Sequence, residues 1–156
     1  MVKELKIGNK APAFNMPTDT GEKIALKDLK GQSLILFFYP KDMTPGCTKE
    51  ALQFRDKFND FNKLGFKIIG ISKDSITRHE KFKEKHDLPF TLASDESTQI
   101  CEKYGVWAEK NMYGRKFMGI VRSTFLIDNN GVIQGIWRKV KVAGHSDEVL
   151  AAAKAL

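Results

Sequence analysis

The chain has 156 residues, which is long enough for one domain to bury a sizeable core without help from disulfides or metals. Its two cysteines are too few for a disulfide-built secreted scaffold, and the first residues, MVKELKIGNK, contain no apolar stretch typical of a signal peptide, so we expect a cytoplasmic protein. The longest apolar run, Leu34 to Tyr39, is about a third of the length needed to cross a bilayer, so we expect no membrane association.

The net charge of +7 raises the question of an anionic partner such as a nucleic acid. In most lysine-rich stretches, however, Asp and Glu alternate with the lysines, as on solvated helix faces, and there is no zinc-finger spacing, RNA-binding signature or glycine-rich phosphate loop. The three histidines are dispersed and show no ligand spacing to either cysteine. We therefore expect no nucleic acid partner, no metal site and no cofactor.

The first third of the chain predicts two short extended segments around a turn at residues 18–21, then a single helical turn. Residues 34–39 predict a strand that is buried on both faces, because six apolar residues follow one another between polar neighbours. After Cys47, apolar residues recur in steps of three and four, which predicts one amphipathic helix ending near Gly65.

The middle of the chain alternates strand and helix signals. We expect a second buried strand at residues 66–72, a surface helix at 75–88 that ends before a proline, a short strand at 90–95 and a helix at 97–105. Alternation of this kind is typical of α/β domains.

The last third predicts a hairpin and a terminal helix. Residues 119–128 and 131–142 flank two asparagines followed by a glycine, a strong hairpin signal, and Ser146 is expected to cap the last helix. The element order predicts an α/β, thioredoxin-like fold with a mixed central sheet and helices on both faces. Because no repeat or linker interrupts the pattern, we expect one domain over residues 1–156.

Cys47 follows a buried strand and opens a helical pattern, a place where sites of α/β proteins form. The N-terminus of a helix favours the thiolate form of a cysteine. The proline and glycine directly before Cys47 fit this position, because proline suits the entry to a helix and glycine lets a ligand approach the backbone. Thr44 can aim its hydroxyl into the same pocket. An inert buried thiol remains an alternative. The neighbouring residues are polar, which argues against it: Lys41, Asp42, Thr44, Thr48 and Lys49.

The run PKDMTPGCTKE, residues 40–50, resembles the active-site motif of the peroxiredoxins, specifically of the bacterioferritin-comigratory-protein (Q-type) subfamily. GNKAPAF near the start, YGVW in the middle and RSTFLID before the hairpin extend the resemblance over nearly the whole chain. The resemblance implies the peroxiredoxin variant of the thioredoxin fold. It also implies an antioxidant thiol peroxidase of cell redox homeostasis, which reduces hydrogen peroxide and alkyl hydroperoxides through a cysteine sulfenic acid.

The resemblance also implies roles for single residues. Cys47 would be the peroxidatic cysteine, the Thr44 hydroxyl would hold the peroxide, Arg122 would complete the pocket and Pro40 would shield the sulfur. A physical argument also favours a cation near Cys47. A helix N-terminus stabilises the thiolate by at most ~2 kcal/mol, and the charge-assisted hydrogen bond of a guanidinium adds roughly 1.5 to 3 kcal/mol. Glu50 could orient Arg122, although a glutamate in a first helical turn is also ordinary helix chemistry.

For regeneration of the oxidised cysteine, the sequence departs from the two-cysteine pattern of many Q-type relatives. Many Q-type relatives carry a second cysteine at a position that is Leu52 here, and another known placement, residues 82–84, also lacks one. We therefore expect a one-cysteine enzyme that is reduced by thioredoxin or another external thiol, and the resemblance implies a monomer. The alternative is a two-cysteine peroxidase with Cys101 as the resolving residue, at the cost of partial unfolding.

Two other functions stay open at this stage. A thiol–disulfide oxidoreductase normally needs a C-x-x-C pair, which Cys47 lacks, and insulin reduction would reveal that activity. A basic interaction module with incidental cysteines would show salt-sensitive DNA binding without peroxide turnover.

Overall fold

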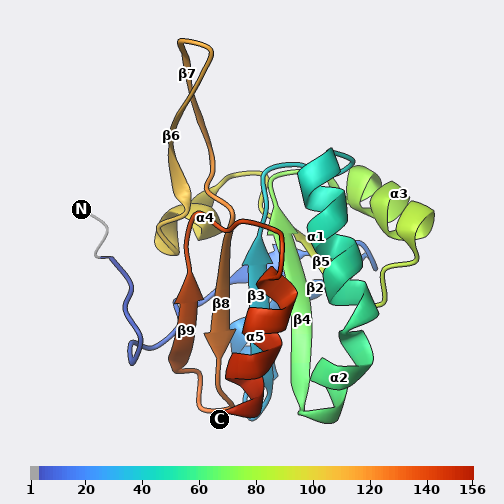
Figure 1. The fold of residues 1–156 in the computed structure, drawn as a ribbon, viewed down its shortest axis with the longest axis vertical. Helices are drawn as coiled ribbons and strands as arrows, with labels where there is room; N and C mark the ends of the chain where they lie inside the picture. The colour runs from blue at the N-terminus through green and yellow to red at the C-terminus, as the bar shows by residue number, and fades with distance from the viewer. Residues whose placement is uncertain (1–3) are drawn as a thin grey trace.

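The computed structural model describes residues 4–156 (Figure 1). At its centre lies a five-stranded sheet, whose strands in spatial order are β5 (Thr91–Ser94), β4 (Phe66–Ser72), β3 (Ser33–Phe38), β8 (Ser123–Ile127) and β9 (Ile133–Trp137). The strands β3, β4 and β5 run parallel, whereas β8 is antiparallel to β3 and β9 is antiparallel to β8. The sheet is therefore mixed, as predicted.

Helices cover both faces of this sheet. One face carries α1 (Pro45–Asp56), α2 (Phe58–Lys63), α3 (Ile76–His86) and α5 (His145–Lys154). The other face carries the antiparallel pair β1 (Asn15–Pro17) and β2 (Lys23–Ala25), the 3-10 helix η1 (Leu26–Leu29) and α4 (Gln99–Lys103). This arrangement confirms the predicted layers and the predicted N-terminal pair of extended segments. No helix among residues 4–156 is long and apolar enough to cross a membrane.

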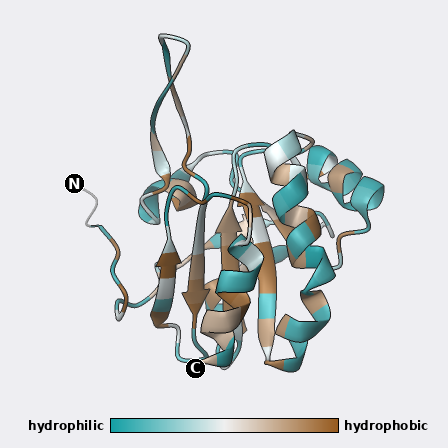
Figure 2. Cartoon of the chain, in the orientation of Figure 1, coloured by the Kyte–Doolittle hydropathy of each residue, from teal (hydrophilic) through white to brown (hydrophobic). Residues whose placement is uncertain are grey.

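The core consists of two layers, because successive side chains of a strand point to opposite faces of the sheet. In β3, Leu34, Leu36 and Phe38 belong to the layer under α4, whereas Ile35 and Phe37 belong to the layer under α1 and α5. The apolar run in the sequence thus marks a strand that is buried on both faces. Figure 2 shows hydrophobic residues concentrated in the central strands, whereas hydrophilic and hydrophobic residues alternate along the helices.

The single helix predicted after Cys47 is two helices in the structure. At Lys57 the backbone leaves helical geometry (φ −103°, ψ 5°), and α2 follows as a separate short helix. The sequence of α2, FNDFNK, is rich in Asn, Asp and Phe, which are weaker helix formers than the Lys, Glu, Ala, Leu and Gln in the middle of α1. The break leaves Phe61 fully buried, with its ring centroid 6.0 Å from that of Phe54.

A second hairpin was not predicted, and the strand expected at 119–128 is wrong in its extent. The strands β6 (Trp107–Met112) and β7 (Arg115–Ile120) form a separate ribbon, and the chain enters β8 only at Ser123. The ribbon turns at Tyr113 and Gly114, both with positive φ (54° and 79°), as in a type I′ turn. The ribbon projects from the end of the sheet at which α1 begins (Figure 1).

The predicted cap of the last helix is also wrong. The helix α5 begins at His145 after Gly144, whose φ of 73° is left-handed, and Ser146 lies buried inside the first turn. Glycine adopts this conformation without strain, which explains why the helix starts there. The acidic first turn is as predicted, with Asp147 and Glu148 placed near the positive end of the helix dipole.

Candidate active site

Cys47 lies in the first turn of α1, directly beyond the end of the central strand β3. Thr44 is the N-cap in extended geometry and Pro45 is the first helical residue, as expected for residues that suit these positions. The first helical hydrogen bond runs from the amide of Thr48 to the carbonyl oxygen of Thr44 at 2.9 Å. The amides of Gly46 and Cys47 precede it and have no acceptor within the helix, so they are available as donors to a ligand.

Arg122 brings its guanidinium to the sulfur. Its Nη2 donates to Sγ of Cys47 at 3.2 Å and its Nη1 donates to Oε1 of Glu50 at 2.8 Å. Arg122 lies between β7 and β8, and its carbonyl oxygen accepts a hydrogen bond from the amide of Val140 at 3.0 Å. The structure thus joins three of the predicted site residues, although Arg122 is far from the other two in sequence.

Thr44 and Pro40 belong to the loop between β3 and α1. The hydroxyl of Thr44 donates to the carbonyl oxygen of Lys41 at 2.8 Å, so its lone pairs remain able to accept a further hydrogen bond. Pro40 is half-buried and lies two residues after the end of β3. A role of Thr44 in holding peroxide, and of Pro40 in shielding the sulfur, is compatible with these positions and stays a prediction.

Glu50 is buried next to Arg122. Burial raises the pKa of its carboxyl group to about 7, although the nearby guanidinium lowers it. Its Oε2 accepts no hydrogen bond from residues 4–156. For Arg122, burial works against the charged form, but the negative charges of Glu50 and Cys47 outweigh it and raise the guanidinium pKa. Arg122 is therefore positively charged at neutral pH.

Two further ionisable side chains near Arg122 were not predicted from the sequence to belong to the site. Burial and then the charge of Arg122 lower the pKa of Lys110, which lies on the hairpin that was not predicted. Burial and then Arg122 also lower the pKa of His145 to about 4, and its Nε2 lies 2.7 Å from the hydroxyl of Thr124. His145 is thus a neutral, buried residue at neutral pH, and no spacing signal pointed to it.

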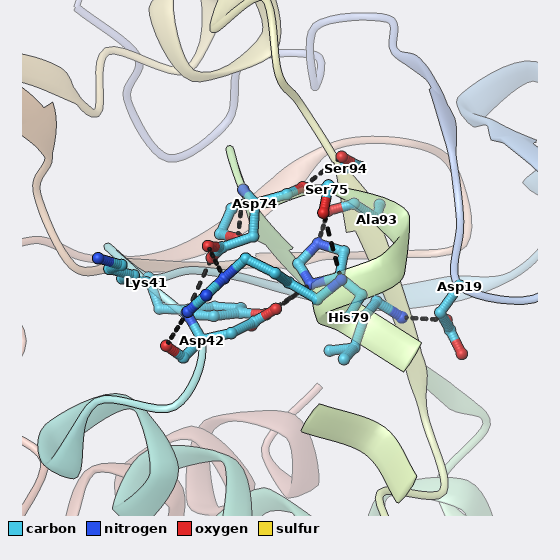
Figure 3. A network of polar contacts seen from close by, with 12 residues as sticks. Asp19, Lys41, Asp42, Asp74, Ser75, His79, Ala93 and Ser94 are labelled. Carbon is cyan, nitrogen blue, oxygen red and sulfur yellow. Dashed lines mark hydrogen bonds and ion pairs between the residues drawn. The ribbon is translucent and has the colours of Figure 1, made fainter. Parts of the chain in front are cut away.

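A buried polar network anchors the loop that leads to Cys47 (Figure 3). One carboxylate oxygen of Asp42 accepts from the hydroxyl of Tyr39 and the other lies next to Nδ1 of His79, both at 2.6 Å. Nε2 of His79 lies 3.0 Å from the carbonyl oxygen of Ala93, which can only accept, so this nitrogen carries a hydrogen. Burial, and then Asp42, raise the pKa of Tyr39, which keeps its hydroxyl protonated as a donor.

The same network extends to β4 and α3 through Asp74. Its Oδ2 accepts from the amide of Asp42 at 2.8 Å and from the hydroxyl of Ser72 at 2.7 Å. Arg78 binds Oδ1 of Asp74 through Nε at 3.0 Å and the carbonyl oxygen of Asp42 through Nη2 at 3.1 Å. Hydrogen bonds to the side chain and to the backbone of Asp42 therefore both hold the active-site loop in place.

Cys101 lies in a different environment. It is fully buried in α4, and it packs in the core layer on the opposite face of the sheet from Cys47. Burial, followed by the influence of Asp95, raises the pKa of the Cys101 thiol. The backbone amide of Cys101 donates to Oδ2 of Asp95 at 2.8 Å. Among the described residues no group of His, Cys, Asp or Glu side chains is arranged to hold a metal ion.

Comparison with known proteins agrees with this geometry. Residues 7–136 match the AhpC/TSA family. The chain is 56% identical over 146 residues to the putative peroxiredoxin bcp of Coxiella burnetii, a match that covers 94% of this chain and 97% of that protein.

Two solved structures are also close. A crystal structure of Xylella fastidiosa PrxQ is 36% identical, with a TM-score of 0.92 and 98% coverage of both chains. The bacterioferritin comigratory protein of Xanthomonas campestris, whose alkyl peroxide reduction activity has been studied through trapped intermediate and ligand complexes, is 45% identical, with a TM-score of 0.87 and coverage of 91% and 90%. These matches confirm the thioredoxin-like fold. The chain belongs to the AhpC/TSA family and, within it, to the peroxiredoxins of the bacterioferritin-comigratory-protein type, and it is accordingly a thiol peroxidase.

Proposed function

We propose that the chain reduces hydrogen peroxide and alkyl hydroperoxides with Cys47 as the attacking thiolate. The observation that carries the proposal is the hydrogen bond of 3.2 Å from Nη2 of Arg122 to Sγ of Cys47, at the start of a helix whose first amides are free. A guanidinium and a helix N-terminus both stabilise negative charge on sulfur. The alkyl peroxide reduction activity of the Xanthomonas campestris relative supports the same substrate class.

Ionisation alone does not account for fast peroxide reduction. An ordinary thiol is already ~3% thiolate at neutral pH, so complete ionisation gains at most about 30-fold. The remaining acceleration must come from groups that stabilise the transition state, in which the O–O bond lengthens and charge moves to the leaving oxygen. Arg122, the Thr44 hydroxyl and the amides of Gly46 and Cys47 are suited to this, because Arg122 contacts the sulfur and the other groups belong to the N-cap and first turn of the helix that carries it.

The chemical step follows from this placement. The thiolate of Cys47 attacks the terminal oxygen of ROOH, the O–O bond breaks, and the electron pair moves to the other oxygen. The products are a sulfenic acid on Cys47 and RO⁻, which takes up a proton and leaves as the alcohol, or as water when the substrate is hydrogen peroxide.

A one-cysteine cycle fits the positions of the two thiols. Cys47 and Cys101 pack on opposite faces of the central sheet, so local unfolding of α1 alone does not remove the sheet that separates them. The raised pKa of Cys101 also keeps it a thiol, which is a poor nucleophile. We therefore favour reduction of the sulfenic acid by thioredoxin or another external thiol, with the chain acting as a monomer in the cytoplasm.

The test is peroxide consumption by wild type, Cys47→Ser and the matched control Cys101→Ser, with an external thiol as reductant. We expect Cys47→Ser to lose turnover and Cys101→Ser to keep it. Retained turnover in Cys47→Ser would rule out the proposal. Intact mass after one equivalent of peroxide then separates the cycles: added oxygen indicates a sulfenic acid or its further oxidation, and the loss of two hydrogens indicates a disulfide with Cys101.

A further inference from the structure

One guanidinium serves two acidic side chains in a buried space. Arg122 donates from Nη1 to Oε1 of Glu50 at 2.8 Å and from Nη2 to Sγ of Cys47 at 3.2 Å. Glu50 is 1% exposed and Cys47 is 2% exposed. A single positive charge cannot fully compensate two negative charges in a buried environment, so the thiolate and the carboxylate compete for it.

The second oxygen of Glu50 favours the protonated form of this residue. Oε2 is buried and has no hydrogen-bond partner in the part of the chain that the structure describes. An ionised carboxylate with an unpaired buried oxygen is costly, whereas a proton on Oε2 removes the charge and leaves the bond between Oε1 and Arg122 in place. In accord with this geometry, burial raises the pKa of Glu50 to about 7 despite Arg122.

The other ionisable groups around this pair come from separate elements. Lys110 on β6 acts on Arg122 and Cys47, and its positive charge favours the thiolate. His145 at the start of α5 faces Arg122 and is neutral at neutral pH, since its pKa is about 4. His145 thus carries no charge that could compensate an ionised Glu50, and the charge of Lys110 acts on Arg122 and Cys47 rather than on Glu50.

We propose that Glu50 stores the proton that the oxidation step consumes: it is protonated while Cys47 is a thiolate and ionises when Cys47 becomes a sulfenic acid. The inference rests on the proposed function, because it concerns the proton balance of Cys47 oxidation. A sulfenic acid is uncharged, so its formation removes the competing anion and leaves Arg122 to Glu50 alone. The two acids thus behave as one coupled titrating pair around Arg122.

The step balances in atoms, electrons and charge. Sulfur is oxidised as it gains the terminal oxygen, and the peroxide is reduced as the O–O electron pair moves to RO⁻. The proton that Glu50 releases balances the proton that RO⁻ takes up. Written in full, the thiolate of Cys47, ROOH and the carboxylic acid of Glu50 give the sulfenic acid, ROH and the carboxylate of Glu50. Glu50 acts through Arg122 and does not contact the sulfur. It is therefore a positioning residue, whose protonation state changes when Cys47 is oxidised.

Proton uptake during a single stoichiometric oxidation, followed with an indicator dye in weak buffer, tests this role. The variant Glu50→Gln keeps an oxygen for Arg122 but cannot ionise, so it should take up about one proton for each thiolate consumed. Wild type should take up clearly less near neutral pH, and should approach the variant at alkaline pH, where Glu50 is ionised before oxidation. The matched control Glu80→Gln, an exposed residue of α3, should behave as wild type.

Equal proton uptake by wild type and Glu50→Gln at neutral pH would overturn the inference. Infrared difference spectra of wild type give a second measurement that needs no variant: oxidation should remove a protonated carboxyl band, and its persistence would also overturn the inference. Intact mass recorded in parallel separates the two possible failures. If no oxygen is added to Cys47, the proposed function has failed; if oxygen is added with equal proton uptake, only the role of Glu50 has failed.

Discussion

A Cβ atom on Gly46 would lie 3.2 Å from Nη2 of Arg122, the same nitrogen that donates to Sγ of Cys47. The guanidinium therefore reaches the sulfur by passing over a helical residue that has no side chain. From the sequence, Gly46 was expected to let a ligand approach the backbone. In the structure the nearest neighbour of the missing Cβ is Arg122. The absence of a side chain at Gly46 therefore also leaves room for the guanidinium to reach Cys47.

The variant Gly46→Ala should lose activity without losing stability. Gly46 has no positive φ, so alanine fits its helical backbone and should leave stability unchanged or raise it by roughly 0.5 to 1 kcal/mol. The new methyl group, however, displaces Arg122 by a few tenths of an ångström, and we expect kcat/KM for peroxide to fall by roughly 3- to 10-fold. Peroxide kinetics and urea unfolding measure the two effects, with Lys49→Ala in the same helical turn as control. Unchanged kinetics in Gly46→Ala would contradict the assigned contact.

Lysine should not replace Arg122. A lysine keeps one positive charge but cannot donate to Sγ of Cys47 and to Oε1 of Glu50 with the fixed geometry of a guanidinium. A lost charge-assisted hydrogen bond of about 1.5 to 3 kcal/mol corresponds to a rate loss of roughly 10- to 150-fold in Arg122→Lys. Stopped-flow oxidation of the reduced enzyme gives the rate. Arg55→Lys, on the surface of α1, is the matched control, and an equal loss in both variants would point to a general effect on folding.

The sequence identified the part of the site that is contiguous. Residues 34–50 carry a local pattern, in which a buried strand, a loop and a helix that starts with proline place Cys47 at a helix N-terminus, and each of these signals depends on near neighbours. Arg122 is different, because only the family resemblance pointed to it. Its approach depends on the packing of β8 beside β3, which no local pattern encodes.

What the sequence did not reveal depends on long-range contacts or on exposure. The β6–β7 ribbon has mostly exposed residues, so it lacks the alternation of buried and exposed side chains that marks a half-buried strand. His79 was set aside because it has no metal-ligand spacing. In the structure it joins Asp42 and Ala93, which come from separate elements that meet only in the folded chain.

The pair of Asp42 and His79 should be important for the stability of the active-site loop. Both side chains are fully buried, and removing one leaves the other without its partner at 2.6 Å. We expect His79→Phe to lower the free energy of unfolding by about 3 to 5 kcal/mol, the usual effect of breaking a buried pair. In urea unfolding, the double variant with Asp42→Asn should lose less than the sum of the single variants, because each single variant already breaks the same contact. Additive losses would show that the two residues act independently.

The pH dependence of stability should carry a signature of His145. Its pKa in the folded protein is about 4, below the ordinary 6.5, because burial and then Arg122 disfavour the cation. Between these two values the unfolded chain binds a proton that the folded chain does not, so this residue makes the protein less stable as the pH falls through 6.5 and adds no further loss below 4.

Glu50 acts in the opposite direction over a similar range. Its pKa rises from 4.5 to about 7 on folding, so the folded chain binds the extra proton and gains stability as the pH falls through that range. In wild type the two effects partly cancel. His145→Gln removes the destabilising effect of His145 and keeps the opposite effect of Glu50, so the variant should gain roughly 1 to 2 kcal/mol relative to wild type between about pH 7 and about pH 4.5. Urea unfolding at both pH values measures this difference, with His86→Gln in the last turn of α3 as the matched control. Parallel stability curves for wild type and His145→Gln would mean that His145 binds its proton equally well in the folded and unfolded chain.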